Sequence, residues 1–244
     1  MRIGVFGISG RMGRLLAEEV AAAGATLSGG TARGDDPAAL ATASDVVIDF
    51  THASTVQAHA RALVGSGTGW VLGTSGLSAA DEAAVVEAAR TIPVVYAPNF
   101  APGVVLVLAL AEQMARALSA NSYDAEIVEM HHRQKVDAPS GTAMGLARAV
   151  AAGRGVELEE AMESGRHGHT GARRPGAIGL AALRGGQVVG EHTLLFAGAS
   201  EHIGLTHRAF DRRVFATGAV RAALWVEGKG AGLFSMRDVL ALGG

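Results

Sequence analysis

Cysteine is absent from this chain of 244 residues. A disulfide framework, a thiol nucleophile and a cysteine-ligated metal site are therefore excluded. Long apolar runs are absent too: the longest, residues 104–111, is far shorter than the roughly 18 residues of a membrane span. The N-terminus has no extended apolar segment of the kind found in secretory signals. We therefore expect a cytoplasmic protein that does not contact a membrane.

Neither sign of charge predominates. Lys plus Arg is 21 and Asp plus Glu is 23, which gives a net charge of −2. Proteins that bind nucleic acid usually carry a basic excess, so we expect no such partner. Hydrophobic residues make up 49% and charged residues 18%, the balance of a folded globular chain. Glycine is abundant, with 34 residues against 6 prolines, and we expect it in tight turns.

Short apolar runs alternate with helical patterns through the first hundred residues. The expected strands are 3–6, 25–29, 45–50, 70–72 and 93–97, and the expected helices are 11–23, 55–64 and 78–89. Ser78 is a suitable N-cap for the last of these helices. Strands that alternate with helices in this way indicate βαβ units and a parallel sheet.

The pattern changes near Pro102. It then predicts helices at 104–118 and from Thr142, a strand at 125–130, a Gly-rich loop at 165–176, and strands at 177–184, 188–196 and 201–209. Turn residues separate the last three strands, which suggests hairpins. A final helix at 215–226 suggests a return to the first domain. We predict an α/β protein: residues 1–101 and 213–244 form the parallel-sheet domain, and 102–212 form a smaller α+β domain with a mixed, hairpin-connected sheet.

A glycine motif joins the first expected strand to the first helix. Residues 7–13 read Gly-Ile-Ser-Gly-Arg-Met-Gly. Glycines let the backbone approach a pyrophosphate, and the helix N-terminus supplies free N–H donors. The spacing differs from the standard G-x-G-x-x-G, so a glycine-rich turn without a ligand is the alternative. Its position at the start of the chain, between strand and helix, favours a dinucleotide site.

The end of the second strand bears on the choice of dinucleotide. An acidic residue there usually binds the ribose 2′-hydroxyl of NAD, but residues 29–33 contain none, and the first carboxylate after them is Asp35. Arg33 is placed to meet a 2′-phosphate, with Arg11 as a possible second contact. The pattern favours NADPH, and a solvated loop charge at Arg33 is the alternative.

Three further loops follow strands of the expected parallel sheet. They are residues 50–52, 73–76 and 97–100. Open parallel sheets bind their ligands at the carboxyl ends of the strands, where these loops lie. Each loop alone is equally consistent with ordinary turn chemistry.

The most specific stretch is 129–143, Glu-Met-His-His-Arg-Gln-Lys-Val-Asp-Ala-Pro-Ser-Gly-Thr-Ala. A histidine exchanges protons near neutral pH, and Lys135 supplies a positive charge or an acid. Ser140, Gly141 and Thr142 lead into a helix whose N–H groups would hold a carboxylate. Together they predict a pocket where an anionic substrate is protonated. One alternative is a zinc site to which His167 and His169 contribute. We expect no metal, because adjacent histidines on a strand point to opposite faces. The other alternative is a histidine pair with a purely structural role.

These stretches closely resemble the dihydrodipicolinate reductase family. The resemblance covers nearly the whole chain, and the stretch from the histidine pair to Ser-Gly-Thr is highly specific. The matching segments are residues 7–14, 73–76, 97–100, 129–143, 168–171, 190–193 and 232–240.

The resemblance implies a Rossmann-type cofactor domain and an enzyme of the diaminopimelate route to lysine. It would reduce 4-hydroxy-tetrahydrodipicolinate (dihydrodipicolinate), a small dicarboxylate, to tetrahydrodipicolinate with NADPH or NADH. The resemblance makes His131 the proton donor and acceptor and Lys135 a second donor. It makes His132, Gly141 and Thr142 substrate ligands and the middle domain the contact surface of a homotetramer. The implied cofactor residues are Gly7, Ile8, Ser9, Gly10, Arg11, Met12, Gly73, Thr74, Ser75, Ala97, Pro98, Asn99 and Phe100.

Two features depart from the family pattern. Many members carry an acid where this chain has Ala32, which argues against strong use of NADH, and the connection 34–44 is shorter than in many members.

Two other interpretations stay open. One is another NAD(P)-dependent dehydrogenase of an amino-acid pathway, although a semialdehyde enzyme with a cysteine nucleophile is excluded. The other is a nucleotide-sensing module without turnover, which would have no need of His131 and Lys135.

Overall fold

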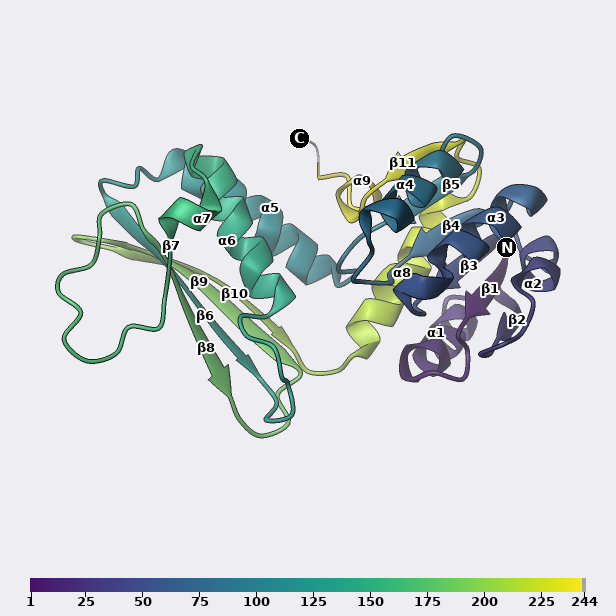
Figure 1. Cartoon of the computed structure of the whole chain (residues 1–244), viewed down its shortest axis with the longest axis horizontal. Coiled ribbons are helices and arrows are strands. Elements are labelled where there is room, and N and C mark those ends of the chain that lie inside the picture. Colours follow the sequence, from purple (N-terminus) through teal and green to yellow (C-terminus); the bar gives the residue numbers. More distant parts are fainter. Residues whose placement is uncertain (243–244) are drawn as a thin grey trace. The chain divides into compact units, whose positions relative to one another are not determined.

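The structure, a computed structural model, describes residues 1–242. These residues form two compact units. Unit 1 comprises Met1–Pro102 and the chain from Arg212 onward, and unit 2 comprises Gly103–Asp211 (Figure 1).

Unit 1 is built on a parallel sheet of six strands. Their bounds are β1 (Arg2–Phe6), β2 (Thr26–Thr31), β3 (Val46–Asp49), β4 (Gly69–Leu72), β5 (Pro93–Tyr96) and β11 (Gly232–Phe234). The order across the sheet is β11-β5-β4-β3-β1-β2. Since β2 and β3 lie on opposite sides of β1, the winding direction of the chain reverses there. Ligands bind beyond the carboxyl ends of the strands at such a reversal.

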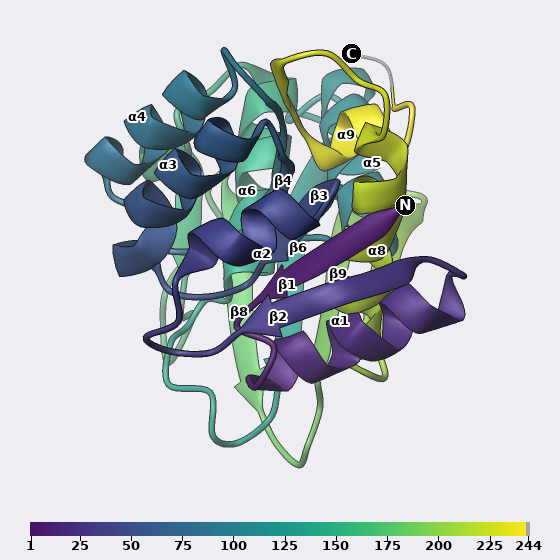
Figure 2. The same ribbon diagram turned by 90° about the vertical axis from the view of Figure 1, so that its right-hand side faces the viewer.

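Helices cover both faces of this sheet (Figure 2). They are α1 (Arg11–Ala22), α2 (Pro37–Ala43), the 3₁₀ turn η1 (Ala53–Thr55), α3 (Val56–Ser66), α4 (Ala79–Ala88), α8 (Arg213–Val226) and α9 (Met236–Val239). The core between the sheet and α2, α3 and α4 contains Trp70 and Leu63, both fully buried. Ser78 and Asp81 form a reciprocal capping box at the start of α4, so the predicted N-cap is confirmed.

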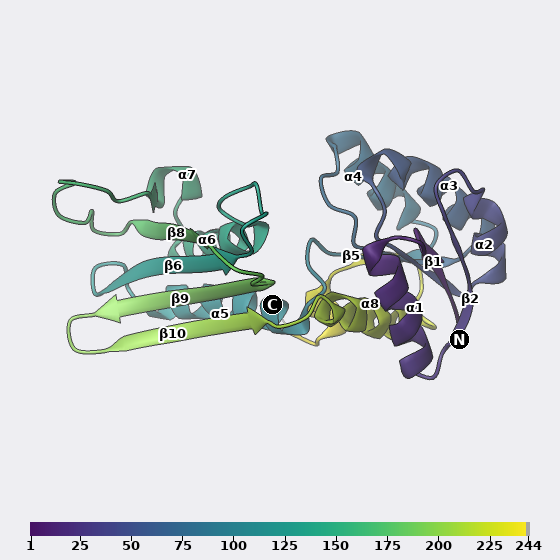
Figure 3. The same ribbon diagram turned by 90° about the horizontal axis from the view of Figure 1, so that it is seen from below.

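Unit 2 holds a mixed sheet in the order β10-β9-β6-β8-β7. Its elements are α5 (Pro102–Ala117), β6 (Tyr123–His131), α6 (Gly141–Arg154), α7 (Leu158–Ala161), β7 (Met162–Ser164), β8 (Ile178–Arg184), β9 (Gly190–Gly198) and β10 (His202–Ala209). Leu146 and Val150 of α6 pack with Ile127, Leu194 and residues of α5 in one core. Helices α5 and α6 lie on one side of this sheet (Figure 3). Because side chains alternate along a strand, every second strand residue faces these helices.

The fold class is confirmed, and one connection differs from the prediction. β9 and β10 form the expected hairpin, with His202 opposite Ala197. β8 and β9, however, are not neighbours, because β6 lies between them, parallel to β8 and antiparallel to β9. A glycine turn after β8 therefore crosses the end of another strand and does not close a hairpin.

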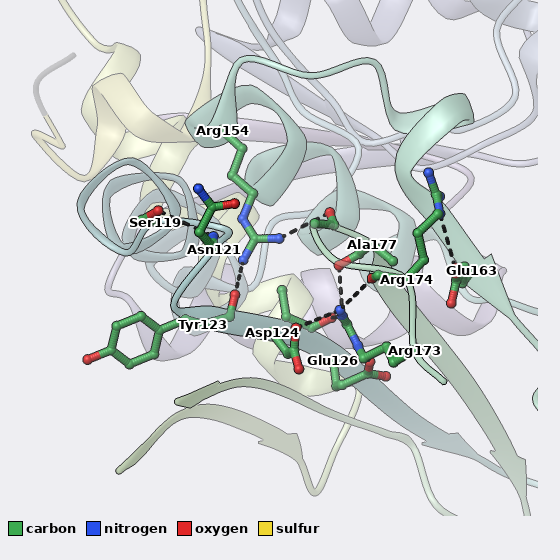
Figure 4. A network of polar contacts seen from close by, with 12 residues as sticks. Ser119, Asn121, Tyr123, Asp124, Glu126, Arg154, Glu163, Arg173, Arg174 and Ala177 are labelled. Carbon is green, nitrogen blue, oxygen red and sulfur yellow. Dashed lines mark hydrogen bonds and ion pairs between the residues drawn. The ribbon is translucent and has the colours of Figure 1, made fainter. Parts of the chain in front are cut away.

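The predicted Gly-rich loop is fastened by arginines (Figure 4). Arg173 donates to the carboxylates of Asp124 and Glu126 on β6, at 2.8 and 2.7 Å, and also to the carbonyls of Ala125 and Ala177. Arg154 of α6 donates to the Tyr123 carbonyl at 2.7 Å. The bonds of Arg173 hold the loop against β6, although the loop has no regular secondary structure.

Candidate active site

The loop after β1 forms a backbone cradle. Gly7 has φ +78°, which favours glycine. A Cβ on Gly13 would lie 2.2 Å from the Gly7 carbonyl oxygen, so this turn of α1 can approach the loop only with glycine there. The N-cap is Gly10, and no side chain caps the first N–H groups of α1. These donors and the partial positive charge of the helix end suit a pyrophosphate.

The three other loops meet at the same edge of the sheet. The Thr51 N–H donates to the Thr74 hydroxyl at 3.1 Å, which joins the loops after β3 and β4. The rings of Phe50 and Phe100 lie 5.4 Å apart and join the loops after β3 and β5. A Cβ on Gly73 would lie 2.3 Å from the Phe50 ring. The structure thus brings the predicted cofactor loops together.

A buried carboxylate, Asp49, contacts these loops, and the sequence alone did not indicate it as a site residue. Asp49, at the end of β3, is fully buried. Its oxygens accept from the Thr51 hydroxyl at 2.6 Å and pair with His59 Nδ1 at 2.7 Å. The Thr74 hydroxyl is 3.4 Å away. Asp49 therefore connects β3 and α3 with the loops that follow β3 and β4. The spacing of Asp49 and His59 gives no signal, because the contact depends on how α3 packs.

Arg33 lies in the turn after β2, and its side chain is exposed. The Asp35 carboxylate accepts the Ala32 N–H at 2.8 Å and closes this turn. A Cβ on Gly30 would lie 2.4 Å from the Ile8 side chain, so the cradle and the end of β2 are in direct contact. Arg33 is therefore next to the edge that would hold a dinucleotide.

In unit 2, His131 stands at the end of β6. Its Nδ1 lies 2.6 Å from Oε2 of Glu129, a residue that is 1% exposed. Arg184, at the end of β8, donates to both oxygens of the same carboxylate at 2.9 Å. The Ser140 N–H is the fourth donor, at 3.1 Å from Oε1. Burial alone would raise the pKa of Glu129, but the bonds from Arg184, His131 and Ser140 lower it, so the group is a carboxylate.

Ser140 joins this cluster to a helix. Its hydroxyl accepts the Ala143 N–H at 3.2 Å and so caps α6. The same hydroxyl lies 3.0 Å from Nε2 of His192 on β9, a residue that is 4% exposed. Burial, and then the charge of nearby His131, lower the pKa of His192 to about 4. His192 is therefore neutral near pH 7.

His192 has a consequence for stability. The folded protein holds its proton only below about pH 4, whereas the unfolded chain takes it up near the ordinary pKa of 6.5. The unfolded state thus binds more protons between these values, and the free energy of unfolding should fall as the pH decreases, by up to roughly 1.4 kcal/mol per pH unit. Urea denaturation between neutral pH and about pH 5 measures this slope. His192→Asn should flatten it, and an equal slope in the variant would contradict the assignment.

Lys135 and His132 lie on the loop that leaves β6. The Lys135 ammonium binds both oxygens of Asp137, each at 2.8 Å, and its side chain is 19% exposed. The hydrogen bond from Lys135 is the main cause that lowers the pKa of Asp137. His132 donates its backbone N–H to the Val188 carbonyl at 2.7 Å, and its Nδ1 is buried without a partner. The loop thus presents a cation and a second imidazole close to His131 in the sequence.

Among residues 1–242 no three His, Asp or Glu side chains are grouped to hold an ion. His167 and His169 lie exposed in the loop fastened by Arg173. None of the helices within these residues has the length and apolar character needed to cross a membrane.

A glycine cradle beyond the carboxyl ends of a parallel sheet is typical of proteins that bind a dinucleotide. Comparison with known proteins specifies the family. The family model "Dihydrodipicolinate reductase, N-terminus" matches residues 1–100, and "Dihydrodipicolinate reductase, C-terminus" matches residues 103–240. The chain belongs to the dihydrodipicolinate reductase family.

Individual relatives agree with this assignment. The chain is 70% identical to the 4-hydroxy-tetrahydrodipicolinate reductase of Granulibacter bethesdensis, over 99% of this chain and 97% of the relative. It is 62% identical to that of Gluconacetobacter diazotrophicus, over 99% and 98%. The solved dipicolinate-bound dihydrodipicolinate reductase from Paenisporosarcina sp. TG-14 has a TM-score of 0.73 at 24% identity, over 96% of this chain and 97% of that one, and shows the same fold. The predicted family, its Rossmann-type sheet and its dependence on a nicotinamide cofactor are confirmed.

Proposed function

We propose that this chain reduces 4-hydroxy-tetrahydrodipicolinate (dihydrodipicolinate) to tetrahydrodipicolinate in lysine and diaminopimelate biosynthesis. The observation that carries the proposal is Glu129. Its two oxygens hold His131 and the Ser140 N–H at the start of α6, so a proton donor stands beside a binding site for a carboxylate. NADPH oxidation by the purified protein, with substrate generated by the preceding synthase, tests the activity. No oxidation by folded protein would contradict the proposal.

The cofactor belongs in the cradle of unit 1, where the absence of a capping side chain at Gly10 suits a pyrophosphate. When bound, the reduced nicotinamide supplies a hydride. The residues that would hold the dinucleotide are Gly7, Ile8, Ser9, Gly10, Arg11, Met12, Arg33, Gly73, Thr74, Ser75, Ala97, Pro98, Asn99 and Phe100.

His131 is the proton donor and acceptor. The bond to Glu129 occupies Nδ1 and fixes the ring, so Nε2 is the nitrogen left to exchange a proton with substrate. A Cβ at position 190 would lie 3.0 Å from this Nε2, and Gly190 leaves that space open. Lys135 is the second donor.

The N-terminus of α6 binds a substrate carboxylate. Gly141 and Thr142 occupy its first turn, where N–H groups and the helix dipole favour an anion. A Cβ on Gly141 would meet no atom within 4 Å, which leaves the backbone accessible. Ser140 holds the turn in place, and His132 and Lys135 add polar contacts and a positive charge.

NADPH is the preferred cofactor because Arg33 binds its 2′-phosphate. A charged hydrogen bond of this kind contributes roughly 1.5–3 kcal/mol, or about ten- to a hundredfold in affinity. We expect Arg33→Ala to weaken NADPH by that factor and to leave NADH almost unchanged. Ala32→Glu should favour NADH, because it adds an acceptor for the ribose and repels the phosphate. Titration of both cofactors measures the effect; equal loss of the two in Arg33→Ala would exclude Arg33 from 2′ recognition.

The protein is a homotetramer whose contacts lie on the second sheet. α5 and α6 pack on one face of that sheet, whereas Val128 and Leu183 on the other face are 42% and 49% exposed. A buried unpaired charge is strongly unfavourable at an interface. We expect Val128→Asp and Leu183→Asp to shift the mass measured by light scattering from tetramer to smaller species. Val86→Asp, at an exposed position of α4, is the control. A monomeric wild type would contradict the proposal.

A further inference from the structure

Arg184 contacts the Glu129–His131 pair and carries a charge that does not change during a proton transfer. Its two terminal nitrogens donate to the two oxygens of Glu129, so the contact is bidentate. A guanidinium stays protonated at every pH at which proteins fold. The register of the parallel pair β6–β8 places Arg184 directly opposite His131.

The charge balance of the cluster depends on Arg184. Glu129 is a carboxylate that is 1% exposed, and a buried charge without a partner is costly. If His131 were its only counterion, release of the His131 proton would leave this charge unpaired. The carboxylate would then resist the release and hold the imidazole in its protonated form. With Arg184 present, Glu129 remains paired before and after the proton leaves.

We propose that Arg184 is a positioning residue that makes proton release by His131 possible, because it keeps Glu129 neutralised in both protonation states of the imidazole. The inference rests on the proposed role of His131. It adds a function to a residue that the sequence places only at a strand end before a glycine turn. Arg184 also donates to the carbonyls of Leu183 and Asp137, so it fixes the loop that carries Lys135.

Two other titratable side chains near His131 are those of His192 and Lys135. His192 on β9 lies with its ring 5.1 Å from that of His131 and is neutral near pH 7. Lys135 is bound to Asp137. Glu129 is therefore the carboxylate that contacts the His131 ring, and Arg184 contacts this carboxylate at its other lone pairs.

Arg184→Met removes the positive charge and keeps an unbranched apolar side chain. The uncompensated Glu129 should then favour the imidazolium of His131, so the ring should keep its proton to higher pH. We expect the midpoint of the His131 ring titration in NMR, and that of the pH profile of kcat/KM, to rise by about one pH unit. The signal is assigned by its loss in His131→Gln. Arg184→Lys, which retains a charge, should shift both midpoints much less.

A purely structural role predicts a different pattern. Activity would then fall at every pH while both midpoints stay in place, and that result in folded Arg184→Met would overturn the proposal. The double variant Arg184→Met with Glu129→Gln removes both charges and should return the midpoint towards that of the wild type. Should Arg184→Met not fold, Arg184→Gln carries the same expected shift. If neither neutral variant folds, a rise of about one pH unit in both midpoints of Arg184→Lys, which keeps the charge, would overturn it.

The NMR titration separates this inference from the proposed function, because it needs no turnover. Near-wild-type activity in His131→Gln would contradict the catalytic role of His131, whatever Arg184 does to the ring. An unchanged ring titration in Arg184→Met would contradict the role of Arg184, while the loss of activity in His131→Gln would still stand.

Discussion

His131→Gln is expected to lower kcat by about 10²–10⁴-fold, the usual contribution of a positioned acid–base group. Glutamine keeps a polar side chain of similar reach but cannot exchange a proton. The change in KM should be smaller, because the helix N-terminus that binds the carboxylate is untouched. The variant leaves Glu129 with its bonds from Arg184 and Ser140, so the fold around the site should be kept. Steady-state kinetics with NADPH and synthase-generated substrate measure both parameters.

The control for this variant is another histidine of the same unit. His202 lies exposed at the start of β10, and His202→Gln should retain full turnover. Circular dichroism and thermal unfolding establish that both variants fold. Turnover near that of the wild type in folded His131→Gln would exclude His131 from proton transfer.

Much of the fold could be predicted because its signals are local. The central strands β1, β3 and β4 of the parallel sheet are apolar runs, and the cap of α4 is a reciprocal Ser78–Asp81 pair. The short strands β7 and β11 carried no such signal, whereas α2 has one that the sequence analysis did not use, Asp36 as N-cap followed by Pro37. β11, for example, has three residues and forms only by pairing with β5. The neighbours of β8 depend on a pairing across more than 50 residues, between Ala125 and Ile178, which no local turn residue specifies.

The candidate site, like the fold, has residues that the local sequence predicts and residues that it does not. His131, Lys135 and Ser140 stand within one stretch of sequence, so their types and spacing indicated the chemistry. Arg184 and His192 reach that stretch only through the pairing of β8 and β9 with β6. The pair of Asp49 and His59 likewise depends on how α3 packs on the sheet. Residues such as Arg184 and His192 join the site through tertiary contacts. A single sequence does not show which strands pair, so these contacts could not be predicted from it.

Lys135→Ala should lower kcat by about 10²-fold or more and also raise KM, because the ammonium serves as proton donor and as a charge for a substrate carboxylate. In the structure this ammonium is bound to Asp137, which is 62% exposed at its side chain. An exposed ion pair of this kind is weak, so an anionic substrate can take over the ammonium at little cost. Removal of Lys135 therefore should affect the substrate complex far more than stability.

Lys135→Arg separates the two roles. Arginine keeps the positive charge and the capacity to bind a carboxylate, but it does not give up a proton in proteins. We expect KM in Lys135→Arg to remain close to that of the wild type while kcat falls nearly as far as in Lys135→Ala. Arg133→Ala removes an exposed cation from the same loop and should leave both parameters unchanged, which controls for the net charge of the loop. If Lys135→Ala also leaves kcat and KM unchanged, Lys135 belongs to the solvated surface, and the second proton must come from elsewhere. If Lys135→Arg restores full turnover, the residue acts through its charge alone.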